Sequence, residues 1–449
     1  MPNLPKPSNS NIFYHPKYIF IDRIGVLFLL GFISEISSVL LTALLLAVGI
    51  YLSVKTNFFQ FKGFLLSIKS VKRAVINRDR KSLSAMLLAL GGTVGVGNIA
   101  GVGAAIALGG AGSIFWIWIC GLIGMITKYA EVYLAVKYKP LGPYGYINDT
   151  FNAYGSIVKI VFCTSCVLSS VLIGSVIQSK AVIDTFTLAF NFDYTVSAAF
   201  IGVPVFILAF SKGEFIKRTS SVAVPFVSVL YIFMTSFVII KKIDAIPSVF
   251  MEIISSAFNP KSTVSGIFGF LFSGTVRQGI SKGLFSHEAG QGSSPIAYSA
   301  DESAKPKESA LFGILEVFVD TGVISTLTAF AMLTSGFWGE NGMISAANMY
   351  IYHLGGVGGV LFAVSIYIFC IAAICGWIYY AKRSIEIISD SKILSVIYSI
   401  TTVLIIPFVA LFPINILWQL SDIFMLLMTL PNLISILNFK KIIIDSIRK

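Results

Sequence analysis

The sequence predicts an all-α integral membrane protein built from two helical repeats that cross the bilayer in opposite directions. Composition is the first reason: of 449 residues, 56% are hydrophobic and only 12% are charged, against roughly 25% charged residues in a soluble domain. Apolar stretches long enough to cross a bilayer also follow one another along most of the chain. Finally, one such stretch in each half of the chain is interrupted by glycines, which is typical of transporter binding sites.

The composition divides the chain into a polar tail, one membrane domain and a basic end. Residues 1–25 are rich in Pro, Asn and Ser and lack the layout of a cleavable signal. Residues 26–440 are expected to form a single transmembrane domain, followed by a basic cytoplasmic tail at 441–449. No segment has the composition of a separate soluble domain.

Eleven membrane spans are predicted from the hydrophobic stretches. They cover residues 26–52, 84–108, 113–137, 157–179, 195–211, 220–240, 264–281, 309–335, 355–379, 393–411 and 415–438. Each is of spanning length or close to it.

Basic residues in the loops predict the orientation. The loop after the first span contains eight basic side chains and one acid, Asp79; the basic ones are Lys55, Lys62, Lys69, Lys72, Arg73, Arg78, Arg80 and Lys81. The positive-inside rule places this loop in the cytoplasm and the N-terminus outside. The net charge of +12 therefore indicates contact with anionic membrane lipid rather than with nucleic acid.

Ten spans remain when the first, extra helix is set aside. Five fall in a first repeat at 84–250 and five in a second repeat at 264–438. Because five is odd, the two repeats must face in opposite directions. Such inverted repeats place a binding site between their broken helices near the middle of the membrane.

The broken helices are recognised by dense glycines. The first break is Gly91–Asn98 and the second is expected at 266–275, which includes Ser273 and Gly274. The alternative interpretation is a close helix-packing face of small residues. The polar Asn98 inside the first break favours a binding site.

A metal site is the weaker interpretation of the cysteines. Cys163 and Cys166 have metal-like spacing, but neither a nearby histidine nor a second pair accompanies them. We expect no cofactor and no metal other than sodium as a coupling ion.

Several long motifs resemble those of one transporter family. In chain order they are Gly92–Val102, Phe115–Glu131, Lys282–Pro295, Phe318–Thr321, Gly376–Tyr380 and Trp418–Asn432. Together they resemble the alanine or glycine:cation symporter family over about residues 25–440.

The resemblance implies a leucine-transporter-like (LeuT-like) fold of five plus five helices with one extra helix in front. It also implies secondary uptake of small neutral amino acids at the cell (inner) membrane, usually coupled to sodium. The substrate-binding residues carried over by the resemblance are Thr93, Gly95, Gly97, Asn98, Gln178, Ser273, Gly274 and Trp377. Backbone amides near Gly95 and Gly97 and the Asn98 amide would hold the carboxylate, while Trp377 would limit side-chain size, unless it belongs to an interfacial aromatic belt.

The coupling ion is where the sequence departs from the family. A Ser/Thr pair usually stands where this chain has Ala372 and Ala373, and an alanine side chain offers sodium no oxygen. Remaining cation ligands would come from Thr93 and from backbone carbonyls such as those of Val94 and Gly97. Sodium, protons or no ion at all therefore stay open as the drive.

Ionisable residues inside predicted spans are functional candidates. Asp320 and Glu316 lie four residues apart on one helical face, and Asp320 is the first candidate for a proton carrier. Lys128 and Glu131 can pair, and Arg277 is expected to meet an acid such as Glu131 or Asp320. A structural ion pair or a gate is the alternative role for this whole group.

Three function classes are compatible with a polar site inside the membrane. The first is a symporter of alanine or glycine, in the L or D form, driven by sodium or protons. The second is an exchanger, sensor or gated channel that keeps the site without ion coupling. The third, a membrane-embedded enzyme using His287 and Glu288, lacks an accompanying nucleophile, metal motif or second histidine nearby. The sequence does not specify the oligomeric state.

Overall fold

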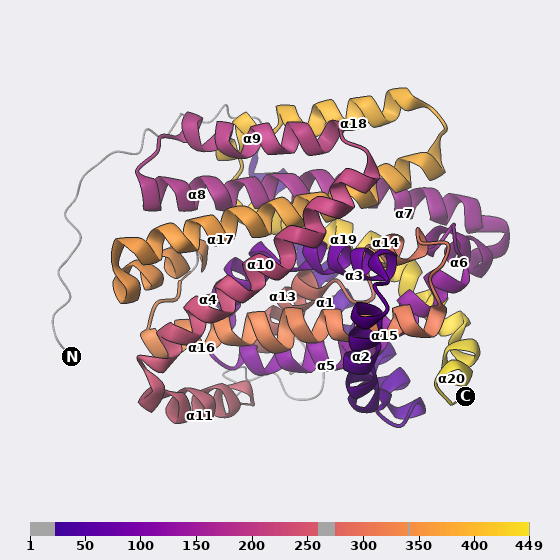
Figure 1. Cartoon of the computed structure of the whole chain (residues 1–449), viewed down its shortest axis with the longest axis horizontal. Helices are drawn as coiled ribbons and strands as arrows, with labels where there is room; N and C mark the ends of the chain where they lie inside the picture. Colours follow the sequence, from indigo (N-terminus) through magenta and orange to yellow (C-terminus); the bar gives the residue numbers. More distant parts are fainter. Residues whose placement is uncertain (1–22, 259–273, 340–341, 449) are drawn as a thin grey trace.

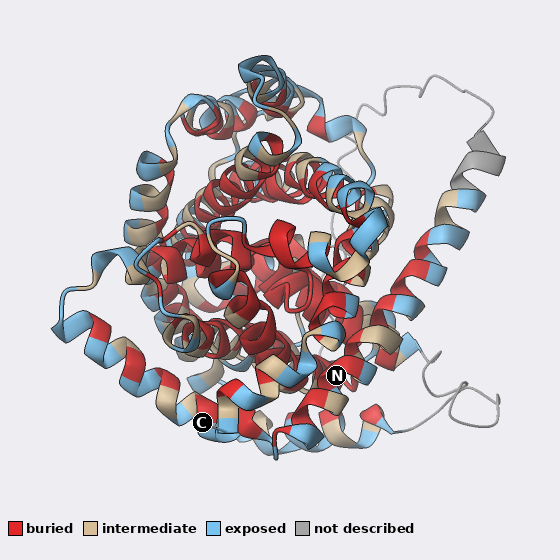
Figure 2. Cartoon of the chain, turned by 90° about the vertical axis from the view of Figure 1, so that its right-hand side faces the viewer, coloured by how far each residue is buried: buried red, intermediate tan, exposed pale blue. Residues whose placement is uncertain are grey.

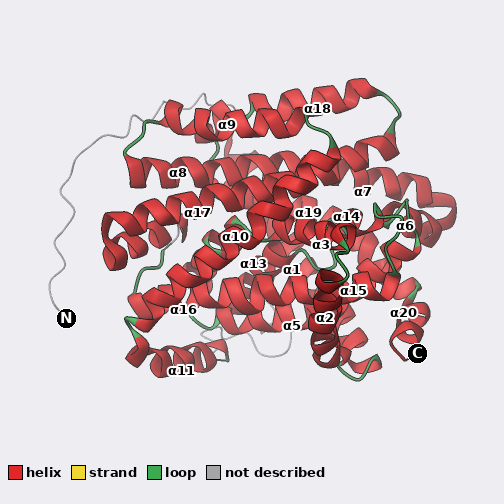
Figure 3. Cartoon of the chain, viewed as in Figure 1, coloured by secondary structure: helices red, strands yellow, loops and turns green. Residues whose placement is uncertain are grey.

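The computed structural model describes residues 23–258, 274–339 and 342–448, with the side chains of 23–28 left aside. Every regular element in these ranges is helical (Figure 3). Figure 1 shows long helices packed side by side, with the short helix α20 at the C-terminal edge of the bundle. The all-α prediction is confirmed.

The helices that correspond to predicted spans have the following bounds. They are α1 (Arg23–Lys55), α3 (Arg80–Thr93) with α4 (Ala100–Gly109), α5 (Ser113–Lys137), α7 (Gly155–Ser169) with α8 (Gln178–Phe190), α9 (Tyr194–Phe210), α10 (Gly213–Ile240), α13 (Gly274–His287), α15 (Pro306–Val317) with α16 (Thr326–Ser335), α17 (Gly342–Ile388), α18 (Lys392–Leu404) and α19 (Ile414–Asn438).

Shorter connecting helices complete the described chain. They are α2 (Phe59–Ile76), α6 (Pro143–Phe151), α11 (Ile246–Ala257), α14 (Pro295–Ser299) and α20 (Lys440–Arg448). Two π-helical segments, η3 (Ser170–Ile177) and η5 (Phe318–Ser325), join α7 to α8 and α15 to α16. Segments of this kind are frequent at functional sites.

Local sequence signals explain where several helices begin or end. The Asp79 carboxylate accepts the Ser82 N–H and caps α3, and Asp193 caps α9 in the same way. Gly336 ends α16 in a left-handed conformation (φ 73°), which glycine adopts without steric cost. Gly355 (φ 68°) divides α17 at a kink, and the predicted span 355–379 begins there.

Seven described helices are long and apolar enough to cross a membrane, and the bent pair α3–α4 makes an eighth. Helices α9 and α18 are apolar but shorter. Part of the predicted span 264–281 lies outside the described residues. The protein is therefore a multi-pass membrane protein.

Burial follows the expected membrane pattern. Figure 2 shows buried positions gathered inside the bundle and exposed ones on its outer surface. Many of the exposed side chains are large and apolar, such as Phe206, Phe226 and Phe233, as expected for a surface in lipid. Helix α1 packs on the outside of the bundle, mainly against α19 and α5.

The bundle has two ends, which we name by the first broken helix. At the α3 end, α3 begins and α5 and α19 finish; at the α4 end, α4 finishes and α13 and α19 begin. Thr275 of α13 donates a hydrogen bond to the Gly109 carbonyl at 2.8 Å, which joins α13 to α4 at the α4 end.

The described residues contain a second break, after α13, that the sequence did not predict. Helix α13 runs unbroken from Gly274 to His287, and the chain regains helix at Pro295 in α14. A break within the described residues therefore lies at residues 288–294. Of the break predicted at 266–275, residues 266–273 lie outside the described residues, while Gly274 and Thr275 belong to α13. Gly279 and Gly283 allow α13 to lie close to neighbouring backbone.

Candidate functional site

The first broken helix changes direction between Thr93 and Ala100. Its two halves are bent by 44°, and Val94 and Gly95 are extended between them. The Asn98 side-chain oxygen accepts the Gly95 N–H at 2.9 Å. One side chain thus satisfies a backbone group that the break sets free, as a membrane interior requires.

Asn98 also ties the break to the π-helical segment η5. Its amide nitrogen donates to the Asp320 carboxylate at 2.8 Å, to the Asp320 carbonyl at 2.9 Å and to the Ser325 hydroxyl at 3.0 Å. The Asn98 amide is therefore fully engaged with protein groups. It positions the broken segment rather than presenting a free donor to a substrate.

Asp320 is a fully buried acid surrounded by neutral donors. Besides Asn98, the hydroxyls of Ser286 and Thr321 donate to its carboxylate at 2.7 and 2.9 Å. No basic side chain of the described residues forms an ion pair with it. A buried carboxylate is costly unless a proton or a cation neutralises it, so this oxygen-rich cluster is suited to binding one.

The second wall of the break comes from Gln178 and Ala373. A Cβ atom added to Gly95 would lie 3.2 Å from the Gln178 Oε1 atom and 3.5 Å from the Ala373 methyl group. The Gln178 amide nitrogen donates to the Ile173 carbonyl at 3.3 Å, whereas its buried oxygen has no hydrogen-bond partner. An unpaired acceptor therefore faces the broken backbone.

Trp377 lies one helical turn beyond Ala373 on α17. It is 1% exposed and packs against η3, where a Cβ atom on Gly174 would overlap it at 2.4 Å. The alternative placement of Trp377 in an interfacial belt is wrong, because its side chain is enclosed by protein. Its indole nitrogen has no partner, and the neighbouring Tyr380 hydroxyl has none either.

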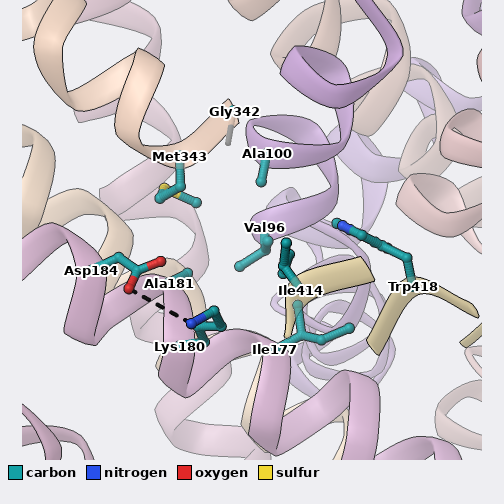
Figure 4. Close-up of a pocket in the computed structure, with 10 residues that line it drawn as sticks. All are labelled: Val96, Ala100, Ile177, Lys180, Ala181, Asp184, Gly342, Met343, Ile414 and Trp418. Atoms are coloured by element: carbon teal, nitrogen blue, oxygen red, sulfur yellow. Dashed lines mark ion pairs between the residues drawn. The ribbon is translucent and has the colours of Figure 1, made fainter. Parts of the chain in front are cut away.

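A narrow hollow leads from the α4 end toward the break (Figure 4). Val96 and Ala100 form one wall, the Lys180–Asp184 ion pair (4.0 Å) lies on another, and Trp418 stands opposite. Its volume of about 20 Å³ is sufficient for about one water molecule. Entry of an amino acid from this end would require the walls to move.

The second break is held by a buried acid. One Glu131 oxygen accepts the N–H groups of Gly290 and Gly292 at 3.0 and 3.1 Å and the Asn432 amide at 2.8 Å. Both glycines have positive φ angles, 87° and 80°. Residues with a side chain rarely adopt such angles, so these two positions favour glycine.

Lys128 joins this break to α15. Its ammonium lies 3.2 Å from Glu131 and 3.3 Å from Glu316, and it donates to the Ser294 hydroxyl at 2.6 Å. All three charged side chains are fully buried. We call Lys128, Glu131 and Glu316 the lysine network, which locks α5, α15 and the second break together at the α3 end.

A family comparison places the chain among known transporters. The sodium:alanine symporter family matches residues 27–449. The chain belongs to this family. It is a membrane transporter and not an enzyme, since its curated relatives are carriers and symporters.

Two relatives and one solved structure illustrate the likeness. The sodium/alanine symporter AgcS of Methanococcus maripaludis is 28% identical, with 90% of this chain and 92% of that protein covered. The probable sodium/glutamine symporter GlnT of Bacillus subtilis is 31% identical, with 92% and 87% covered. A Na⁺-coupled sialic acid symporter structure matches with a TM-score of 0.54 at 14% identity, covering 84% of this chain and 81% of that one. The fold is thus LeuT-like.

The structure brings most family-type site residues together, with three exceptions. Ser273 lies outside the described residues. Gly274 starts α13 beside α4's last residue, Gly109, more than three helical turns from the second break. Arg277 pairs with Glu35 of α1 at 3.5 Å, not with Glu131 or Asp320, because α13 presents it at the α4 end.

Thr93 is close to the break but directs its hydroxyl to the Leu90 carbonyl at 3.0 Å. Gly97 allows the two broken helices to approach, since a Cβ atom there would lie 3.0 Å from the Ser286 Cα atom. Ala372 and Ala373 are fully buried beside the first break, at the position expected for a second set of cation ligands.

Five side-chain partners of Asn98, Asp320, Lys128 and Glu131 were not assigned from the sequence: Ser286, Thr321, Ser325, Ser294 and Asn432. All of these except Ser325 lie inside the motifs quoted above, so the motifs could have indicated them. Ser325 could not be found in this way. It meets Asn98 only because the π-helical segment η5 shifts the register of the helix that contains it.

Proposed function

We propose that this chain imports a small neutral amino acid, alanine or glycine, together with one cation bound at Asp320. The observation that carries the proposal is a pair of hydrogen bonds made by the Asn98 side chain, which accepts one from the Gly95 N–H and donates the other to the Asp320 carboxylate. The substrate region and the acid therefore share one side chain. Neutralising Asp320 would change the position of the segment that receives the amino acid. Cation binding and substrate binding would then influence each other, as coupled transport requires.

The substrate would bind between the first break and Gln178. Helix α4 points its N-terminus at the break, and a helix N-terminus favours a carboxylate. The free Gln178 oxygen would accept a hydrogen bond from the substrate's ammonium group. Ala373 and, one turn beyond, Trp377 leave little room for a side chain, which supports alanine or glycine over larger residues.

The cation would be sodium or a proton. The Asp320 cluster supplies hard oxygen atoms from one carboxylate and from the hydroxyls of Ser286, Thr321 and Ser325. The alternative position beside α17 offers methyl groups from Ala372 and Ala373. One cation per cycle, held at Asp320, is therefore the coupling that we propose.

Exchange without ion coupling is the second candidate function, and the two alanines are the observation that favours it. Both functions use the same substrate site. They differ in concentrative uptake, which only a coupled symporter performs.

The proposed setting is the cell membrane, with the N-terminus outside and the C-terminus in the cytoplasm. The basic residues of α2 and of the segment around it support this orientation. The α3 end of the bundle would then face the cytoplasm.

Counterflow and uptake in proteoliposomes test the proposal. Labelled alanine should exchange against internal alanine in the wild-type protein, and it should accumulate when a sodium or pH gradient is applied. Exchange without accumulation under either gradient would favour the uncoupled exchanger. Absence of both would exclude alanine as the substrate.

A further inference from the structure

A second cavity of about 330 Å³ lies beside the transport path at the α4 end. It is enclosed by α1, α4, α13 and α19, and we call it the lateral pocket. Its volume falls within the range of small-molecule sites. Trp418 lines both this pocket and the narrow hollow of Figure 4.

Four charged side chains with zero net charge line the lateral pocket. Glu35 and Asp422 are the acids, and Arg277 and Lys282 are the bases. Asp422 is 8% exposed, and its two oxygens accept hydrogen bonds from Ser34 at 3.2 Å and from Ser281 at 3.3 Å. Arg277 and Glu35 pair at the more exposed side, 3.5 Å apart.

Lys282 is the member of this group that has neither a hydrogen bond nor an ion pair within 4 Å among the described residues. It is only 7% exposed, yet no described residue accepts a hydrogen bond from its ammonium group or forms an ion pair with it. Its closest aromatic contact is the Trp418 ring, whose centroid lies 4.1 Å away. The Lys282 side chain lines the pocket beside Asp422, so an anionic group there would be stabilised by a charge-assisted hydrogen bond to its ammonium.

Lys241 provides a comparison for Lys282. Its ammonium also lies over an aromatic ring, that of Phe237 at 5.0 Å. Unlike Lys282, it donates a 2.6 Å hydrogen bond to a backbone oxygen, that of His353. Both lysines lie over an aromatic ring, but Lys241 is exposed and has a protein acceptor, whereas Lys282 is buried and has none among the described residues.

We propose that the lateral pocket binds a small zwitterion at a second site, separate from the transported substrate. The anionic group would lie against Lys282, and a primary ammonium would lie against Asp422 and Glu35. An anionic ligand would leave the two acids without a partner, and a cationic ligand would leave Lys282 without one. Binding of a ligand with net charge is therefore disfavoured. The bound zwitterion would touch Trp418 and so influence the wall of the entry hollow.

Two sources carry this chemistry: a free amino acid in the outer solution and the headgroup of phosphatidylethanolamine. Phosphatidylcholine is also a zwitterion, but its quaternary ammonium has no N–H to donate to a carboxylate. It therefore serves as the inert lipid for the test.

The test uses the full-length protein in phosphatidylcholine nanodiscs and counts bound ligands. Equilibrium binding of labelled alanine and native mass spectrometry of added phosphatidylethanolamine are measured for the wild type, Lys282→Met and Asp422→Asn. Lys282→Arg retains the charge and Lys241→Met is the matched control. We expect one ligand, alanine or the lipid, to bind ~10- to 100-fold more weakly to Lys282→Met and to Asp422→Asn than to the wild type. Lys282→Arg and Lys241→Met should bind it with wild-type affinity.

Gln178→Ala separates this inference from the proposed function. That variant should lose the central alanine site and keep the Lys282-dependent ligand. If neither alanine stoichiometry nor lipid retention differs between the wild type and both Lys282→Met and Asp422→Asn, the lateral pocket holds only water and the inference is overturned. Melting temperatures of all variants, measured in parallel, identify any loss of folded protein.

Discussion

At both broken helices a side chain accepts hydrogen bonds from backbone N–H groups that the break leaves without helical partners, but the side chains differ in charge. At the first break, a neutral side chain, Asn98, satisfies Gly95 and reaches an acid that has no basic partner, Asp320. At the second break, an acid, Glu131, satisfies two backbone N–H groups directly and is neutralised by Lys128. Both arrangements are fully buried.

This difference indicates a division of roles between the breaks. The lysine network carries its own countercharge, so it is stable without any ion from outside. The Asp320 cluster lacks a countercharge and must obtain one from solution. We therefore expect the second break to maintain the fold of the α3 end and the first break to respond to ions.

Loss of Lys128 should have the largest effect. Lys128→Met leaves Glu131 and Glu316 buried without their cation, and breaking a buried ion pair in this way costs about 3–5 kcal/mol. We expect little folded protein, measured as monodisperse yield and melting temperature in detergent. Adding Glu316→Gln should recover part of the loss. A wild-type melting temperature for Lys128→Met would contradict the structural role of the network.

The two asparagines compare the breaks directly. Asn98→Ala and Asn432→Ala each remove a buried hydrogen bond to a carboxylate, at a cost of roughly 1.5–3 kcal/mol. We expect both to lower the melting temperature, but only Asn98→Ala to change the ion dependence of alanine uptake. Equal changes in ion dependence would remove the distinction between the breaks.

Gln178 tests the substrate side of the first break. Because its Oε1 atom has no protein partner, Gln178→Ala should weaken alanine binding on the order of ten- to a hundredfold with little loss of stability. The matched control is Gln60→Ala, since the Gln60 Oε1 atom is also buried and unpaired but belongs to α2. Unchanged alanine affinity in Gln178→Ala would place the substrate elsewhere.

A conservative change at Trp377 should have the smallest effect, limited to selectivity. Trp377→Ala is expected to admit leucine or methionine, but it also destabilises the fold, because a buried Trp→Ala change costs about 3–5 kcal/mol. Trp377→Phe retains aromatic packing against Gly174 and is the sharper variant. Competition assays should show uptake of valine rising relative to alanine by roughly tenfold. An unchanged ratio would remove Trp377 from the pocket wall.

Features that depend on residues close together in the sequence were predicted correctly. Contacts between segments far apart in the sequence were not. Span 113–137 matches α5 residue for residue, because hydrophobic length decides where a helix crosses a membrane. The first break was found because its glycines enclose a polar residue. The partner of Arg277 could not be found, since it lies on α1. Neither could the break at residues 288–294, where Gly290 and Gly292 donate their N–H groups to Glu131 of another helix.

The most direct test of coupling at the first break is the ion dependence of alanine uptake in Asp320→Asn. Uptake would be measured against sodium concentration at fixed membrane potential, with and without a pH gradient, for the wild type, Asp320→Asn and Ala373→Thr. We predict that the wild type accumulates alanine with one of the two gradients and depends only shallowly on sodium concentration. Ala373→Thr should make the sodium dependence steeper. Asp320→Asn should still exchange alanine but no longer accumulate it. Accumulation by Asp320→Asn at the wild-type level, driven by either gradient, would contradict the account.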